Sequence, residues 1–105
     1  MGSTTKNSKI YVVVKEPGNP TGEIREVDNT RRAFQELVGG HIEAITMDEG
    51  LAVICNEDGR FLDLPHNCKF GGIDFVGTIA IVGVDGEDVA DCPLGIDELD
   101  EWMEI

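Results

Sequence analysis

The chain has 105 residues, and its eight Lys and Arg side chains face 21 Asp and Glu side chains, a net charge of -13. This length fits one domain, and a hydrophobic content of 41% argues against a chain that is disordered throughout. The excess of negative charge disfavours direct binding to nucleic acid or to an anionic membrane.

The first part of the chain predicts a flexible leader followed by a β-hairpin. Residues 1–8 are polar and are set apart from a single small α+β domain over residues 9–105. Lys9 to Lys15 is rich in β-branched residues and predicts a strand. Glu23 to Val27 predicts a second strand, and the Pro and Gly residues between the two are typical of a hairpin loop.

A helix is predicted next. Asp28 or Asn29 is expected to cap its first turn, and the helix then runs to about Val38. Gly39 and Gly40 end it, because glycine adopts the left-handed conformation without strain. The apolar residues recur at helical spacing and predict one buried face; they are Ala33, Phe34, Leu37 and Val38.

The middle of the chain predicts further strands separated by acidic or glycine turns. A hairpin of His41 to Met47 and Leu51 to Asn56 is expected, with Asp48 to Gly50 as its turn. The remaining segments are a short extended piece over 60–64, an irregular stretch over 64–72, a central strand over 73–84 with a bulge at Gly77, and a short pairing strand over 87–90.

The C-terminal segment Leu94 to Ile105 predicts an amphipathic helix with an acidic outer face. The resulting fold class is α+β: a mostly antiparallel sheet of about five or six strands, packed on one face against the first helix, with the acidic C-terminal helix at an edge or end. The expected core comprises Ile10, Val12, Val14, Phe34, Leu37, Ile42, Val53, Phe75, Ile79, Ile81 and Trp102.

No metal, cofactor or catalytic residue is predicted. Cys55, Cys68 and Cys92 are too widely spaced for a structural zinc site. The acidic turns at 56–59 and 85–88 lack the spacing of a calcium-binding loop. His66 and Cys68 lie two residues apart, which leaves a thiol–imidazole site as an alternative to buried, unreactive cysteines.

The acidic C-terminal end is the most distinctive surface. The last 21 residues contain nine of the acidic side chains and no Lys or Arg. Such a charge run is usually a solvated face, but it also attracts basic protein surfaces. The candidate contact residues here are Asp85, Glu87, Asp88, Asp97, Glu98, Asp100 and Glu101.

Several blocks taken together resemble an uncharacterised family, domain of unknown function 3846. The blocks are Lys9 to Lys15, Val38 to Glu43, Gly50 and Leu51 leading into Ile54 to Glu57, Leu64 to Asn67, and Val76 to Thr78 leading into Ile81 to Asp88. The resemblance implies an origin in phages, conjugative elements or Gram-positive gut bacteria. It implies no activity, because none is assigned to the family.

The block Leu64 to Asn67 lies in the irregular stretch, and polar residues on ordered loops often bind partners. His66, Asn67 and Lys69 are therefore further candidates for interaction. Family members often have a basic residue directly after this block, whereas here Cys68 precedes Lys69. The structural alternative is a simple turn fixed by Pro65.

These observations favour a small, acidic, non-enzymatic interaction module that binds an unidentified protein, without membrane contact or direct nucleic acid binding. One alternative is a DNA mimic that blocks a nucleic-acid-binding defence protein, and another is a small-ligand binder or enzyme using His66 and Cys68. The reduced, widely spaced cysteines and the polar N-terminus predict a cytoplasmic protein. The oligomeric state stays open at this point.

Overall fold

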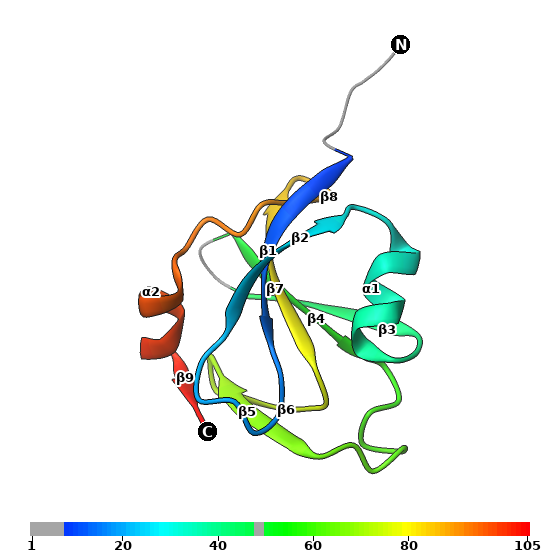
Figure 1. The fold of residues 1–105 in the computed structure, drawn as a ribbon, viewed down its shortest axis with the longest axis vertical. Coiled ribbons are helices and arrows are strands. Elements are labelled where there is room, and N and C mark those ends of the chain that lie inside the picture. The colour runs from blue at the N-terminus through cyan, green and yellow to red at the C-terminus, as the bar shows by residue number, and fades with distance from the viewer. Residues whose placement is uncertain (1–7, 48–49) are drawn as a thin grey trace.

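The computed structural model describes residues 8–47 and 50–105. In these residues the chain forms a larger and a smaller antiparallel sheet and two helices (Figure 1). Apart from Ser8, the expected leader lies outside the described residues, as do Asp48 and Glu49 of the expected turn.

The larger sheet has the strand order β2-β1-β7-β4-β3, with β8 also paired to β7, and the smaller sheet has the order β6-β5-β9. Every described pairing is antiparallel, so the expected α+β class is confirmed. The elements are β1 (Lys9–Lys15), β2 (Glu23–Asp28), α1 (Arg31–Val38), β3 (Ile42–Thr46), β4 (Leu51–Asn56), β5 (His66–Phe70), β6 (Ile73–Val76), β7 (Ile79–Asp85), β8 (Asp88–Ala90), α2 (Ile96–Glu101) and β9 (Met103–Glu104).

The larger sheet is buried on both faces, so the described chain has three layers. Successive side chains of a strand point to opposite faces. Val12 and Val14 of β1 accordingly pack with Phe34 of α1, whereas Val13 packs with Phe70 of β5 and Leu99 of α2. The smaller sheet and α2 therefore lie on the side opposite α1, and Asp100 of α2 accepts hydrogen bonds from Thr21 in the loop between β1 and β2.

Helix α1 begins one or two residues later than predicted. Thr30 is its N-cap, and its Oγ1 accepts a hydrogen bond of 3.1 Å from the backbone N of Ala33. The prediction of Asp28 or Asn29 as the cap is wrong, because Asp28 still belongs to β2 and pairs with Lys9. The predicted end is confirmed, since Gly39 has a φ of 79°.

The segment between β4 and β7 differs most from the prediction. Residues 60–63 form turns instead of an extended piece, and the stretch predicted as irregular contains β5. The predicted central strand is divided at Gly77, whose φ of 71° only glycine adopts freely. Its first part, β6, joins the smaller sheet, and its second part, β7, is the centre of the larger one.

The C-terminal helix is also shorter than predicted. Helix α2 ends at Glu101, and Met103 and Glu104 form β9, which pairs with Phe70 and Lys69 of β5. No described helix is long and apolar enough to span a membrane.

Most of the expected core is buried. The buried members are Ile10, Val12, Val14, Phe34, Val53, Phe75, Ile79 and Ile81. Leu37 and Ile42 are partly buried. Trp102 is expected in the core but is 37% exposed, because α2 ends before this residue. Its ring still contacts that of buried Phe70, with 6.1 Å between the ring centroids.

Candidate binding groove

An open groove of about 550 Å³ lies where the two sheets meet. Glu43 and Ile45 of β3 and Cys55 of β4 form one wall, β6 forms the other, and the turn from Glu57 to Phe61 closes one end. A groove of this size has room for several side chains of a partner.

Four carboxylates line the groove, from Glu43, Glu57, Asp58 and Asp74. Arg60 is the cationic residue among the lining residues, and its Nη2 donates a hydrogen bond of 2.9 Å to the backbone oxygen of Asp74. The guanidinium is thus anchored to β6. Carboxylates gathered along a cleft focus the local field and favour cationic partners.

The groove also carries exposed apolar side chains. Phe61 is 92% exposed and Ile73 is 37% exposed, and both line the groove together with Ile45. A phenylalanine that makes so little contact with its own chain stabilises the fold very little. Aromatic side chains are enriched at the centres of protein interfaces, so Phe61 has the properties of a contact residue.

The turn that presents Phe61 is held by Asn56, which is buried. Its Oδ1 accepts a hydrogen bond of 2.8 Å from the backbone N of Asp58, and its Nδ2 donates one of 3.1 Å to the backbone oxygen of Val38 in α1. The backbone N of Gly59 donates to the oxygen of Asn56 at 3.2 Å. The end of the groove is therefore fixed to the α1 layer before any partner arrives.

Cys55 lies on the groove wall, but it does not have the properties of a nucleophile. Burial, and secondarily the carboxylate of Glu43, raise the pKa of its thiol to about 11. Burial also raises the thiol pKa values of Cys68 and Cys92. The thiolate is the reactive form of cysteine, so these three side chains are protonated and weakly reactive near neutral pH.

The loop candidates His66, Asn67 and Lys69 lie on β5, not on a loop. His66 and Lys69 are exposed, whereas Asn67 and Cys68 are buried. A register shift between His66 and Cys68 turns both Asn67 and Cys68 inward. The prediction of Asn67 as a surface contact is therefore wrong, and the exposed imidazole is not presented beside an exposed thiol.

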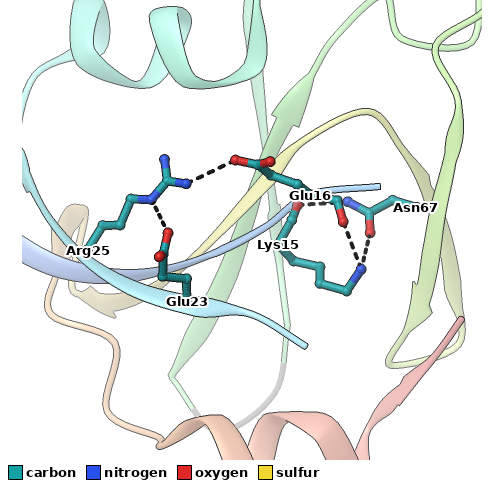
Figure 2. Close-up of polar contacts among 5 residues, drawn as sticks. All are labelled: Lys15, Glu16, Glu23, Arg25 and Asn67. Carbon is teal, nitrogen blue, oxygen red and sulfur yellow. Dashed lines mark hydrogen bonds and ion pairs between the residues drawn. The ribbon is translucent and has the colours of Figure 1, made fainter. Parts of the chain in front are cut away.

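Asn67 instead forms a buried clasp with Lys15 (Figure 2). The Nζ of Lys15 donates to Oδ1 of Asn67 and to the backbone oxygen of Glu16, both at 3.0 Å. The Nδ2 of Asn67 donates to the backbone oxygens of Lys15 at 2.8 Å and Gly77 at 2.7 Å. This clasp ties β1 to β5 and to the corner at Gly77.

Several exposed basic residues of the described chain are paired with carboxylates. Arg25 lies between two carboxylates (Figure 2): its Nε donates to Glu23 at 2.6 Å and its Nη2 to Glu16 at 2.9 Å. These hydrogen bonds, first that to Glu23 and then that to Glu16, raise the pKa of Arg25. The Nε of Arg32 lies 3.6 Å from Oε2 of Glu36, four residues further along α1.

The acidic candidates lie elsewhere on the surface. Asp85 and Glu87 are exposed at the β7–β8 turn, Asp88 is exposed on β8, and Asp97, Glu98 and Glu101 are exposed on α2. Two carboxylates of α2 have partners: Asp100 accepts hydrogen bonds of 2.8 and 3.0 Å from Oγ1 of Thr21, and Glu98 accepts one of 3.3 Å from the N of Gly95.

None of the ten predicted contact residues lines the groove. The sequence reasoning missed Glu43, Phe61 and Asp74. The signal available for Phe61 was an aromatic residue that comes directly after the acidic glycine turn Glu57 to Gly59 and its neighbour Arg60. Within residues 8–47 and 50–105, no group of three or more His, Cys, Asp or Glu side chains is placed to hold a metal ion.

A comparison with models of known protein families shows which family the chain belongs to. The model described as domain of unknown function (DUF3846) matches residues 9–104. The chain belongs to this family. The match includes α2 and β9 as well as the blocks that carry the resemblance in the sequence. No curated protein and no solved structure matches the chain.

For this DUF3846 chain, the chemistry of the groove is therefore the basis for a function. Its carboxylates and protonated thiol offer hydrogen-bond acceptors, negative charge and apolar contact. Such a surface is complementary in charge and polarity to cationic and apolar groups, and it provides no activated nucleophile among the described cysteines.

Proposed function

We propose that this DUF3846 chain is a small non-enzymatic binding module whose partner is a protein with a segment that is both basic and apolar. The observation that carries the proposal is the groove itself, which four carboxylates line together with the 92% exposed side chain of Phe61. The carboxylates supply electrostatic attraction, and Phe61 with Ile45 and Ile73 supplies apolar contact area.

The distribution of cations supports this choice of partner. Of the eight Lys and Arg residues, all but Lys6 are described. Lys9, Arg25 and Arg32 form ion pairs with carboxylates. Lys15 is buried, and Arg60 is bonded to a backbone oxygen. Arg31 and Lys69 are exposed. The 21 Asp and Glu residues outnumber the eight Lys and Arg residues, so most of the negative charge is uncompensated. This excess accelerates association with a basic protein and makes the association sensitive to salt.

The proposal places the module in the cytoplasm of a cell that carries a phage or another mobile element. The free state of Cys55, Cys68 and Cys92 supports a reducing compartment. The mobile-element setting rests on the habitat implied by the family resemblance, and it adds an accessory or counter-defence role by association alone.

A pull-down with a matched pair of variants tests the function. The tagged protein is incubated with lysate at low and high salt, and captured proteins are identified by mass spectrometry. The groove variant Glu43→Gln/Asp74→Asn/Phe61→Ala is expected to lose a partner that the native chain captures. The control Glu87→Gln/Asp97→Asn removes the same number of charges away from the groove and is expected to retain it. A partner captured equally by both variants would contradict the proposal.

The DNA-mimic function is the second candidate, and the exposed carboxylates of Asp97, Glu98 and Glu101 on α2 favour it. A mimic occupies the DNA site of its partner, so added duplex DNA should displace the partner and affinity should fall log-linearly with salt. In that case the control variant, rather than the groove variant, would lose the partner.

A further inference from the structure

The open edges of the two sheets differ in how they are protected against pairing. Natural proteins block an exposed edge with charges, Pro, bulges or very short strands. The edge strand β2 has four charged residues out of six, EIREVD. The edge strand β6 has Asp74, whose backbone oxygen is already bonded to Arg60.

The opposite edge of the larger sheet, β3, has little such protection. Its sequence IEAIT contains one charged residue and no Pro, and its pairing with β4 is regular over all five residues. In the described part of the chain, β3 is paired only to β4. An edge of this kind is a template on which another extended chain can pair.

The hydrogen bonds at the two ends of the β3–β4 hairpin show which backbone groups of β3 are open. The backbone N of Met47 donates to Leu51 O, and that of Glu57 donates to His41 O, both at 2.8 Å. In an antiparallel pair, hydrogen-bonded and non-hydrogen-bonded residues alternate. The backbone N–H and C=O groups of Ile42, Ala44 and Thr46 therefore point away from β4, toward the open edge.

The side chains of β3 connect this edge to the groove. Glu43 and Ile45 lie on the face of the larger sheet that lines the groove, and Ile42 lies on the α1 face. A strand added to β3 would place every second side chain beside Glu43 and Ile45. One such side chain would meet a carboxylate, and another, two residues away, would meet an apolar wall.

We infer that the partner's basic segment binds as an added antiparallel strand on β3, with a Lys or Arg opposite Glu43 and an apolar residue, two positions away, opposite Ile45. This inference rests on the proposed function and adds its mode of binding. A second copy of the chain fits the edge poorly, because each copy has a net charge of -13 and two such surfaces repel one another.

A designed peptide tests the inference directly. The probe is dye-labelled, acetylated and amidated Thr-Arg-Thr-Val-Thr-Arg-Thr, whose palindromic sequence fits either direction. In antiparallel pairing the Thr residues exchange hydrogen bonds with Ile42, Ala44 and Thr46, whereas the N–H groups of Arg and Val point to solvent. N-methylation of the Thr residues should weaken binding by about tenfold or more. N-methylation of Arg and Val should leave it within about twofold.

Variants of Ala44 test the same contact from the side of the protein. Ala44→Pro removes an N–H that points away from β4, so the hairpin keeps its hydrogen bonds while the edge is blocked. It should reduce probe affinity by about tenfold or more, whereas Ala44→Thr should not. Circular dichroism and the melting temperature check that both variants fold.

The outcomes separate the inference from the proposed function. Binding that is lost in Glu43→Gln/Asp74→Asn/Phe61→Ala, but is unaffected by Ala44→Pro and by both methylated peptides, would overturn strand addition and keep the groove as the binding site. No binding of the probe at concentrations up to about 1 mM would overturn strand addition for this peptide chemistry, whatever the pull-down shows. Self-association that Ala44→Pro abolishes would assign the edge to a second copy and overturn the basic partner.

Discussion

Lys15 and Asn67, 52 residues apart in the chain, hold each other through reciprocal hydrogen bonds between β1 and β5. The Nζ of Lys15 donates to Oδ1 of Asn67 at 3.0 Å, and Nδ2 of Asn67 donates to the backbone oxygen of Lys15 at 2.8 Å. Lys15 is 0% exposed and Asn67 is 1% exposed. A buried ammonium is costly unless its donors have partners, so this pair fixes how the smaller sheet sits on the larger one.

Asn67→Ala should destabilise the fold by about 2–4 kcal/mol, because it leaves the Nζ of Lys15 and the oxygens of Lys15 and Gly77 without their amide partner. Urea unfolding gives the free energy of unfolding. Lys69→Ala, at an exposed position of the same strand, is the control and should change it by less than about 0.5 kcal/mol. Equal effects of the two substitutions would contradict the structural role of the clasp.

The double variant Lys15→Met/Asn67→Leu tests the coupling between the two residues. Replacing both side chains removes the Nζ of Lys15 and the Oδ1 of Asn67, each of which loses its partner in one of the single variants Lys15→Met and Asn67→Leu. The backbone oxygens of Lys15 and Gly77 lack the amide in Asn67→Leu and in the double variant alike. The loss in unfolding free energy should therefore be smaller than the sum of the single losses by at least about 1 kcal/mol. Additive losses would mean that the two side chains act independently.

Gly77→Ala should lower the free energy of unfolding more than Gly86→Ala does, although both glycines have a positive φ, of 71° and 65° respectively. A Cβ at Gly77 would lie 2.7 Å from Cδ1 of Leu64, whereas nothing lies within 4 Å of a Cβ at Gly86. Both variants should lose about 1 kcal/mol of unfolding free energy, because alanine is strained in the left-handed conformation. Gly77→Ala should lose about 1 kcal/mol more, because its Cβ is too close to Leu64. Urea unfolding of the two variants measures the difference, and equal losses would show that Leu64 moves aside freely.

The free energy of unfolding should fall as the pH rises from about 9 to about 11. Burial raises the pKa of Cys55 from its ordinary value of 9.0 to about 11, so the unfolded chain loses its thiol proton first and is stabilised above pH 9. Chemical unfolding at several pH values should show a smaller fall in Cys55→Ala than in the native chain. An identical fall in both would contradict the raised pKa.

The rate of thiol modification gives a second test of the raised pKa of Cys55. At pH 8 about one thiol in a thousand is ionised when the pKa is about 11, so reaction of the folded protein with iodoacetamide should be slow and should accelerate with pH. The same chain unfolded in urea is the control and should react much faster. Fast reaction of the folded protein at neutral pH would indicate an activated thiolate instead.

Added salt should raise the melting temperature. The chain has a net charge of -13, so its acidic side chains repel one another in the folded state, and salt screens this repulsion. Relief of about 1 kcal/mol would raise the melting temperature by about 4–8 °C between 10 mM and 300 mM NaCl, as measured by calorimetry. Glycerol of matched osmolality is a control without charge. A melting temperature that falls with salt would mean that the ion pairs of Lys9 and Arg25 outweigh the repulsion.

The parts of the fold that were predicted correctly depend on neighbours in the sequence. The β3–β4 hairpin and the C-terminal end of α1 follow from local alternation and from Gly39. The strand β5 was missed because its sequence, HNCKF, is polar and lacks alternation. The buried amide of Asn67 is satisfied by Lys15, far away in the chain, and by the backbone oxygen of Gly77.

The same reasoning explains the missed groove and the shortened helix. Glu43, Phe61 and Asp74 come from three elements, and only the meeting of the two sheets brings them together. The acidic residues of the last segment fit an amphipathic helix, but Met103 and Glu104 are held in an extended conformation by pairing with β5. Such pairing between distant segments outweighs local helix propensity.

The central position of β7 has a consequence for how the chain folds. The β1–β2 and β3–β4 hairpins join neighbouring segments, but β7 pairs with β1 on one side and with β4 on the other, so that Ile81 lies opposite both Val13 and Val53. Closing the loop from Val13 to Ile81 is entropically costly before native contacts compensate it. We therefore expect the hairpins to form early and the insertion of β7 between them to limit the rate, so that Ile81→Val should slow refolding while Ile42→Val mainly speeds unfolding.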